Sequence, residues 1–168
     1  MEAVWSILRK AFFLDRDGLI NRKAAEHDYI KTWSEFEFLP GVHEAVKKIN
    51  DAGYYVIVVT NQQGVARKMM TIADVNDIHH RMCMEFTKSG ACIDGIYVCT
   101  HAKGTCTCRK PEIGLFHMAE QDFEIEKNGS WMIGDSEVDE QAGKKYGVRT
   151  IVTNDLLSAV QKIIKEAT

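Results

Sequence analysis

The chain of 168 residues has no long hydrophobic run, no excess of charge of one sign and almost no proline. No apolar stretch approaches the roughly 18 residues that a membrane span requires, which excludes a membrane partner. The 21 Lys and Arg balance 24 Asp and Glu to a net charge of -3, so nothing favours nucleic acid as a partner. With only 2 prolines and no linker or repeat, we expect one domain over residues 1–168, acting as a monomer on a small molecule.

The cysteines are also few, and their odd number argues against a disulfide framework. The five stand at positions 83, 92, 99, 106 and 108, three of them close to His101. Such crowding suits metal binding in a reducing compartment better than disulfide bonding. The apolar residues Val4, Trp5, Ile7 and Leu8 form a stretch too short for a signal-peptide core. We therefore expect a cytoplasmic protein.

Short apolar runs alternate along the chain with segments of helical periodicity. The runs predict strands at 11–14, 54–59, 96–98, 131–133 and 150–152, and the periodic segments predict helices at 42–49, 75–86 and 156–164. Nearly continuous apolar runs are typical of strands buried on both faces. The order predicts an α/β protein, a three-layer Rossmann-like fold with a central parallel sheet. Ligands of such folds bind at the carboxyl ends of the strands.

Two carboxylates, Asp15 and Asp17, directly follow the first predicted strand in the sequence Asp15-Arg16-Asp17-Gly18. A carboxylate at a strand end serves as a nucleophile toward phosphorus or as a metal ligand, and a second one can transfer a proton. Asp and Gly are also common turn residues, so this tetrapeptide alone equally fits a turn.

Polar and cationic groups follow two later elements. Thr60 and Asn61 end the second predicted strand and suit phosphate oxygens, although they also fit a buried β-branched residue and a turn former. Arg109 and Lys110 form a basic pair before a proline. Exposed basic pairs are usually solvated, but a lysine can neutralise a phosphoryl group during its transfer.

Two more acids, Asp135 and Asp139, follow the fourth predicted strand. If Asp135 meets Asp15 in one site, the two carboxylates repel each other unless a divalent cation lies between them. Hard oxygen ligands of this kind select Mg²⁺. The alternative for Asp135 is a helix cap.

Four metal ligands of a second type fall within ten positions. They are Cys99, His101, Cys106 and Cys108. Three thiolates and an imidazole form the tetrahedral set that Zn²⁺ prefers, and with no open position the ion is structural. We expect a zinc-binding loop at 99–108 that directs the following Arg109 and Lys110 toward a phosphate.

Together these motifs resemble the haloacid-dehalogenase-like phosphotransferases, in the family's order and at strand ends. The resemblance spans roughly residues 12–154 and implies that the first and fourth strands are neighbours. It implies that Asp15 is the nucleophile that forms an aspartyl-phosphate and that Asp17 is the general acid and base. It further implies Mg²⁺ held by Asp15, Asp135 and the Asp17 backbone carbonyl, with Asp139 acting indirectly. The expected phosphate ligands are Thr60, Asn61 and Lys110.

Within that superfamily the zinc loop and the segment from Thr60 to Arg67 resemble the D-glycero-D-manno-heptose 1,7-bisphosphate phosphatases and the related histidinol phosphatases. This implies removal of the C7 phosphate of a heptose bisphosphate in nucleotide-activated heptose biosynthesis, with Arg67 and Arg109 binding the substrate. The short zinc loop is nearer the histidinol type, and Ser136 replaces a lysine common in heptose enzymes. Histidinol-phosphate hydrolysis and a non-catalytic phospho-acceptor or interaction module are the alternatives. The motif spacing leaves no room for a cap domain, so the rim of the site is expected from the 21–37 loop, the segment after Asn61 and the zinc loop.

Overall fold

A computed structural model describes residues 7–168, so Val4 and Trp5 of the N-terminal apolar stretch lie outside the described residues. Its centre is a parallel sheet of five strands in the order β3-β2-β1-β4-β5. The strands are β1 (Ala11–Leu14), β2 (Tyr55–Asn61), β3 (Gly95–Cys99), β4 (Trp131–Gly134) and β5 (Arg149–Val152). The first and fourth strands are therefore neighbours, as the family resemblance predicts.

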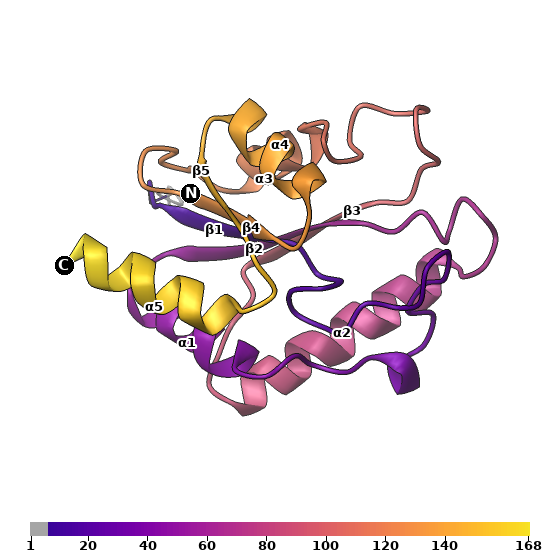
Figure 1. Cartoon of the computed structure of the whole chain (residues 1–168), viewed down its shortest axis with the longest axis horizontal. Coiled ribbons are helices and arrows are strands. Elements are labelled where there is room, and N and C mark those ends of the chain that lie inside the picture. The colour runs from indigo at the N-terminus through magenta and orange to yellow at the C-terminus, as the bar shows by residue number, and fades with distance from the viewer. Residues whose placement is uncertain (1–6) are drawn as a thin grey trace, which may run out of the picture.

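Helices cover both faces of this sheet (Figure 1). On one face lie α1 (Val42–Asp51), α2 (Ile72–Lys88) and α5 (Leu156–Ala167), and on the other lie α3 (Gly114–Asp122) and α4 (Glu137–Tyr146). A short 3₁₀ helix, η1 (Trp33–Glu35), interrupts the long segment after β1. The three layers confirm the predicted α/β fold.

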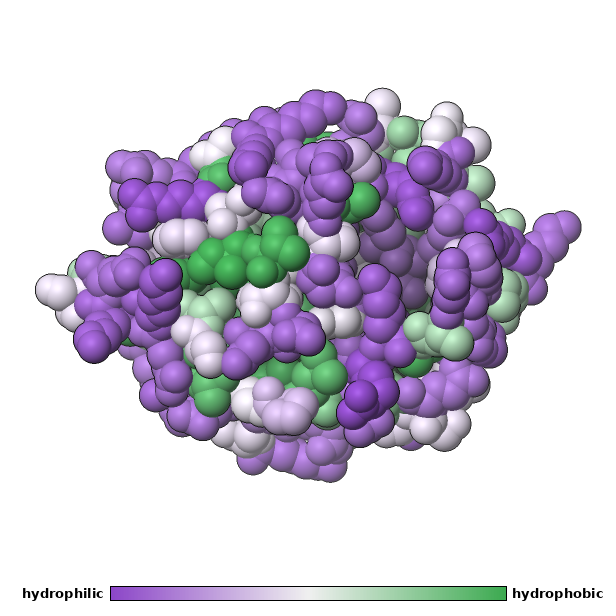
Figure 2. Space-filling view, viewed as in Figure 1, coloured by the Kyte–Doolittle hydropathy of each residue, from purple (hydrophilic) through white to green (hydrophobic). Residues whose placement is uncertain are grey.

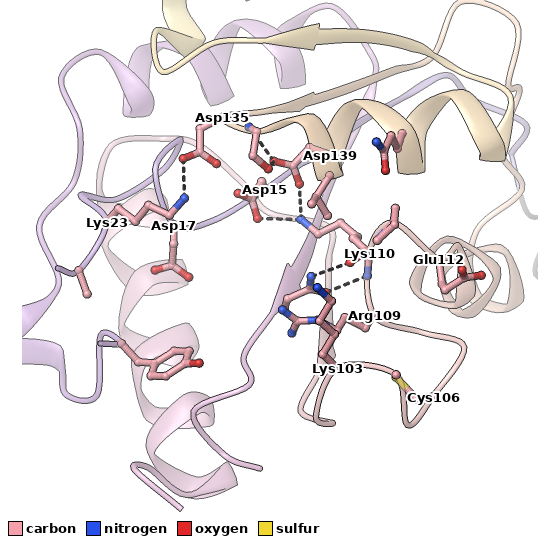
Figure 3. Close-up of a pocket in the computed structure, with 18 of the residues that line it drawn as sticks. Asp15, Asp17, Lys23, Lys103, Cys106, Arg109, Lys110, Glu112, Asp135 and Asp139 are labelled. Atoms are coloured by element: carbon pink, nitrogen blue, oxygen red, sulfur yellow. Dashed lines mark hydrogen bonds and ion pairs between the residues drawn. The ribbon is translucent and has the colours of Figure 1, made fainter. Parts of the chain in front are cut away.

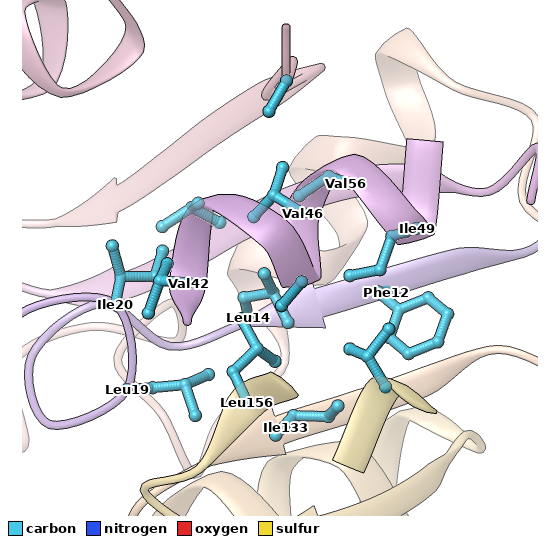
Figure 4. Close-up of a cluster of buried hydrophobic side chains, with 14 of the residues drawn as sticks. Phe12, Leu14, Leu19, Ile20, Val42, Val46, Ile49, Val56, Ile133 and Leu156 are labelled. Atoms are coloured by element: carbon cyan, nitrogen blue, oxygen red, sulfur yellow. The ribbon is translucent and has the colours of Figure 1, made fainter. Parts of the chain in front are cut away.

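The core explains why β1 is apolar throughout. Phe12 and Leu14 pack in the cluster that contains α1 and α5, whereas Ala11 and Phe13 pack in the cluster on the α3 and α4 side. Because successive strand residues point to opposite faces, a strand covered on both sides needs apolar residues at every position. Figure 4 shows Phe12 and Leu14 between α1 and the first turn of α5. Burial of each such side chain contributes about 1.5–3 kcal/mol.

Two capping boxes fix the starts of helices that approach the carboxyl edge of the sheet. Thr71 and Asp74 exchange side-chain to backbone hydrogen bonds at the start of α2. Ser136 and Asp139 form the same arrangement at the start of α4. The cap of α4 is thus Ser136 and not Asp135, which leaves the Asp135 carboxylate available to the site.

Two elements differ from the sequence-based expectation. The strand β5 lies at the edge of the sheet and is partly exposed at all four positions, so it is not a strand buried on both faces. The helix α3 is absent from the predicted elements. It begins at a glycine, has no side-chain cap and buries only Leu115, Phe116 and Ala119, so its sequence carries little helical signal.

Within residues 7–168, no helix combines the length and the apolar composition needed to cross a bilayer. The face seen in Figure 2 is mostly hydrophilic, with hydrophobic residues exposed in separate patches.

Candidate active site

A cavity of about 930 Å³ lies at the carboxyl ends of the central strands. Asp15, Asp17, Lys110 and Asp135 all line it, although they follow three different strands in the sequence. The cavity sits where β1 has β2 on one side and β4 on the other, which is the topological switch point of this sheet. Figure 3 shows Asp15, Lys110 and Asp135 converging from separate elements.

The Lys110 ammonium lies between two buried carboxylates. Its Nζ is 2.8 Å from Asp15 Oδ1 and 2.6 Å from Asp139 Oδ1, and its side chain is only 2% exposed. Burial raises the pKa of Asp15 to about 7, with Lys110 opposing this rise and Asp139 adding to it. Although burial disfavours its charge, the two carboxylates hold the pKa of Lys110 above its usual range.

Asp135 lies beside this group, at the end of β4. Its Oδ2 accepts a hydrogen bond from Lys23 Nζ at 3.1 Å, and the lysine reaches it from the loop after β1 (Figure 3). The backbone of Gly18 runs so close that a Cβ there would collide with the Asp135 carboxylate, and Gly18 has a φ of +89°. Glycine is therefore required at this position both for space and for the left-handed backbone.

The carboxylates of Asp15, Asp135 and Asp139 offer oxygens that all lie within 4.8 Å of one another. Asp139 is already engaged, because it bonds Lys110 through Oδ1 and Ser136 through Oδ2. Asp15 and Asp135 are the better placed ligands. Hard carboxylate oxygens at this separation fit a divalent cation such as Mg²⁺.

The Asp17 carboxylate points away from the other three acids (Figure 3) and is held by its own set of donors. Its Oδ1 accepts from Arg16 Nη2 and Asn21 Nδ2, both at 2.9 Å, and its Oδ2 accepts from Gln62 Nε2 at 2.8 Å. Burial alone would raise the pKa of Asp17, but the Arg16 charge and these hydrogen bonds hold it below its usual range.

Asn61 and Thr60 are bonded to the protein at the end of β2. The Asn61 amide accepts from Lys110 N at 3.0 Å and donates to Lys110 O at 3.1 Å, so it clamps the lysine backbone. The buried Thr60 hydroxyl accepts from Gln62 Nε2 at 2.9 Å. Only Asn61 of the two lines the cavity.

The two arginines expected to bind substrate differ in position. Arg109 lines the cavity, and its buried Nη1 has no hydrogen-bond partner among the described residues. Arg67 is exposed in the turn after β2 and is not among the residues that line the cavity.

The rim of the cavity comes from the loop at 23–30, from residues 103–107 of the expected zinc loop and from the first turns of α4. Beyond Asn61, the segment after β2 does not contribute to the described lining. The expectation was wrong for that segment, whose place is taken by α4 residues such as Ser136 and Val138.

The four residues of the expected zinc site come together beside the cavity. Their ligand atoms all lie within 4.8 Å of one another, and the set is Cys99, His101, Cys106 and Cys108. The Sγ atoms of Cys99 and Cys106 are 3.6 Å apart. Sulfurs bound at about 2.3 Å on a tetrahedral ion are roughly 3.8 Å apart, so the cluster fits Zn²⁺.

Three polar contacts of the site could not be predicted from the sequence motifs. Lys23 reaches Asp135 across 112 positions, and His79 of α2 reaches Arg16 across 63 positions. Gln62 lies within the motif after β2, but nothing in the sequence shows that its amide turns toward Asp17. Only the tertiary fold brings these groups to the site.

Comparisons with known proteins agree with this geometry. A family model described as polynucleotide kinase 3 phosphatase matches residues 10–157. The D-glycero-alpha-D-manno-heptose-1,7-bisphosphate 7-phosphatase of Mycobacterium tuberculosis is 47% identical over 104 residues, which are 61% of this chain and 54% of that protein. The match thus spans about half the length of that relative. The D-glycero-beta-D-manno-heptose-1,7-bisphosphate 7-phosphatase of Haemophilus ducreyi is 36% identical over 152 residues, 86% of this chain and 82% of that protein.

Among solved structures, the D,D-heptose 1,7-bisphosphate phosphatase from B. bronchiseptica, complexed with magnesium and phosphate, superimposes with a TM-score of 0.81 at 28% identity. The match covers 94% of this chain and 99% of that one. The same arrangement of strands and the extended sequence matches lead to one conclusion. The chain belongs to the haloacid-dehalogenase-like phosphatases, in the family of the D-glycero-D-manno-heptose 1,7-bisphosphate 7-phosphatases.

Proposed function

We propose that the protein is a Mg²⁺-dependent phosphatase that removes the C7 phosphate of D-glycero-D-manno-heptose 1,7-bisphosphate through an aspartyl-phosphate. The observation that carries the proposal is the meeting of Asp15, Asp135 and Lys110 in one cavity at the switch point of the sheet. Relatives of 36% and 47% identity, named for this reaction, support the choice of substrate.

In this reaction Asp15 attacks phosphorus, and the bond from phosphorus to the C7 oxygen breaks. Asp17 gives a proton to the leaving oxygen and then removes one from the water that hydrolyses the aspartyl-phosphate. Asp15, Asp135 and the Asp17 backbone carbonyl would hold Mg²⁺, which would supply positive charge for the phosphoryl oxygens. The neighbour complexed with magnesium and phosphate supports this ion. Asp139 acts indirectly, because it holds Lys110 and not the substrate.

Lys110 is the main protein cation for the transferring phosphoryl group, since its ammonium already lies beside Asp15. Asn61 completes the phosphoryl site and also fixes the Lys110 backbone. The buried Thr60 hydroxyl would reach a phosphoryl oxygen only if it left its bond to Gln62. Arg109 binds the second phosphate of the substrate, and its unpartnered Nη1 supports that role. Arg67 could bind substrate only if the turn after β2 moves toward the cavity.

The cluster of Cys99, His101, Cys106 and Cys108 holds a structural Zn²⁺ in this proposal. The loop that carries this cluster leads directly into Arg109 and Lys110, so a bound ion would fix the loop and orient both cations. We further propose that residues 1–168 form one phosphatase domain, which works as a monomer in the cytoplasm.

The test is a comparison of kcat/KM for both anomers of heptose 1,7-bisphosphate and for L-histidinol phosphate, with Mg²⁺ present. We expect a strong preference for a heptose bisphosphate and release of the C7 phosphate, identified by phosphorus NMR of the product. Asp15→Asn is the inactive control. A preference for histidinol phosphate, or a product that keeps its C7 phosphate, would contradict the proposal.

A further inference from the structure

Arg16, the residue between the two acids of the β1 motif, is the largest fully buried side chain of the described residues. Its Nη2 donates to Asp17 Oδ1 at 2.9 Å, and its Nη1 lies 3.0 Å from His79 Nε2. Its Nε is buried without a hydrogen-bond partner. Among the described residues, the guanidinium thus has two hydrogen-bonding partners, Asp17 and His79, and it also lies over the Phe36 ring at 5.9 Å from the ring centre.

The other contact fixes the tautomer of His79. A guanidinium only donates hydrogen bonds, so Nε2 of His79 must accept, and the ring proton must be on Nδ1. His79 is 7% exposed and lies on α2, a helix from which none of the described hydrogen-bond donors to Asp17 comes. Burial and the neighbouring Arg16 lower the pKa of His79 to about 3, which agrees with a neutral ring.

We propose that Arg16 and His79 are a positioning pair for Asp17. The inference rests on the proposed function, in which Asp17 protonates the leaving alcohol. Without His79 the buried guanidinium would keep Asp17 as its one hydrogen-bonding partner among the described residues, and it could turn or draw in water. His79 supplies a second, neutral partner on the opposite nitrogen. The pair thereby holds the Asp17 carboxylate in the orientation from which proton transfer starts.

The leaving group of the substrate distinguishes this role from a general structural one. An alkyl phosphate releases a weakly acidic alcohol and needs a proton from Asp17. A 2,4-dinitrophenyl phosphate releases an anion that is stable without one. Loss of Asp17 positioning therefore slows cleavage of the alkyl ester selectively, whereas a general loss of folded protein slows both esters equally.

The experiment measures kcat/KM of purified full-length variants with Mg²⁺ for heptose 1,7-bisphosphate and 2,4-dinitrophenyl phosphate. We expect His79→Leu to lower the value for the alkyl ester at least about tenfold more than for the aryl ester, which is part of the roughly 10²–10⁴ that general acids contribute. His79→Gln, whose amide oxygen can accept from Arg16, should recover most of the loss. His80→Leu changes the exposed neighbour of His79 and should behave as wild type.

Equal losses on both esters in His79→Leu, or no recovery in His79→Gln, would overturn the pairing. If His79→Leu does not fold, the double variant Arg16→Met and His79→Leu replaces both partners with apolar groups and leaves no orphaned charge. The double variant should show the same selective loss on the alkyl ester. If its ratio of kcat/KM for the alkyl ester to that for the aryl ester equals the wild-type ratio, the inference is overturned. A wild-type protein inactive on both esters would instead refute the proposed function itself.

Discussion

Substitution of Lys110 by Met should both destabilise the metal-free protein and remove most of its activity. The side chain keeps a similar length but loses the ammonium that lies 2.8 Å from Asp15 and 2.6 Å from Asp139. Two buried carboxylates then face each other without a cation between them, while Asp135 lies close by. The variant therefore isolates the contribution of a single buried charge.

The size of the effect follows from the geometry. Unit charges 2.8 Å apart attract by about 6 kcal/mol at an effective dielectric constant of about 20. Desolvation of the ammonium offsets part of this attraction, and removal of one partner from a buried pair costs about 3–5 kcal/mol. We expect a decrease of about 3–5 kcal/mol in the free energy of unfolding. Loss of charge stabilisation at the phosphoryl group should lower kcat by about 10²–10³.

The assay is urea denaturation of wild type and Lys110→Met, each with a chelator and with Mg²⁺. The metal should recover more stability in the variant, because it supplies the missing positive charge. The control is Lys110→Met combined with Asp139→Asn, which removes one carboxylate charge and should regain part of the stability but no activity. A loss below about 1 kcal/mol in chelator, as for an exposed ion pair, would refute the reasoning.

Three further predictions concern the zinc loop, the metal site and the buried histidine. Cys106→Ser should lower the bound zinc and the melting temperature, whereas Cys92→Ser, outside the cluster, should change neither; metal analysis and thermal denaturation check this. Lys23→Met removes the ammonium that pairs with Asp135, so it should tighten Mg²⁺ binding about two- to fivefold in calorimetry. Lys103→Met removes another lysine of the cavity lining and should leave Mg²⁺ binding unchanged. The pKa of His79 is lowered to about 3, so below pH 6.5 its ring becomes protonated in the unfolded chain but stays neutral in the native protein. Stability is then lost as the pH falls, and between pH 7 and 5 wild type should lose about 2 kcal/mol more than His79→Gln in urea denaturation.

The sequence predicts those elements that are determined by neighbouring residues in the chain. β1 is apolar at each position because both of its faces are covered, and Asp15 follows it because a strand of a parallel sheet ends at the ligand edge. The Thr71 capping box is likewise visible as a short pattern. By contrast, α3 begins at Gly114 without a side-chain cap, and packing against the sheet stabilises it. No pattern of neighbouring residues predicts such a helix.

The same distinction applies to the candidate site. Strand-end residues such as Asp15 and Asp135 are recognisable because their spacing follows the spacing of the strands. Lys23 comes from a loop and His79 from the middle of a helix, and each meets its partner only in the tertiary structure. Their contacts depend on side-chain direction across layers, which residue order does not encode.

The residues proposed to cleave the phosphate ester and the residues that face the rest of the substrate lie on different parts of the structure. The acids follow strand ends, Asn61 clamps the backbone of Lys110, and Gly18 lies directly against Asp135. These side chains therefore have little room to shift. The part of the cavity that faces the rest of the substrate is formed by loops and the start of α4. Loop changes can therefore alter which phosphate ester enters without moving the atoms that cleave it. For this reason, substitutions in the 23–30 loop should change KM among sugar phosphates far more than they change the leaving-group dependence that we propose for Asp17.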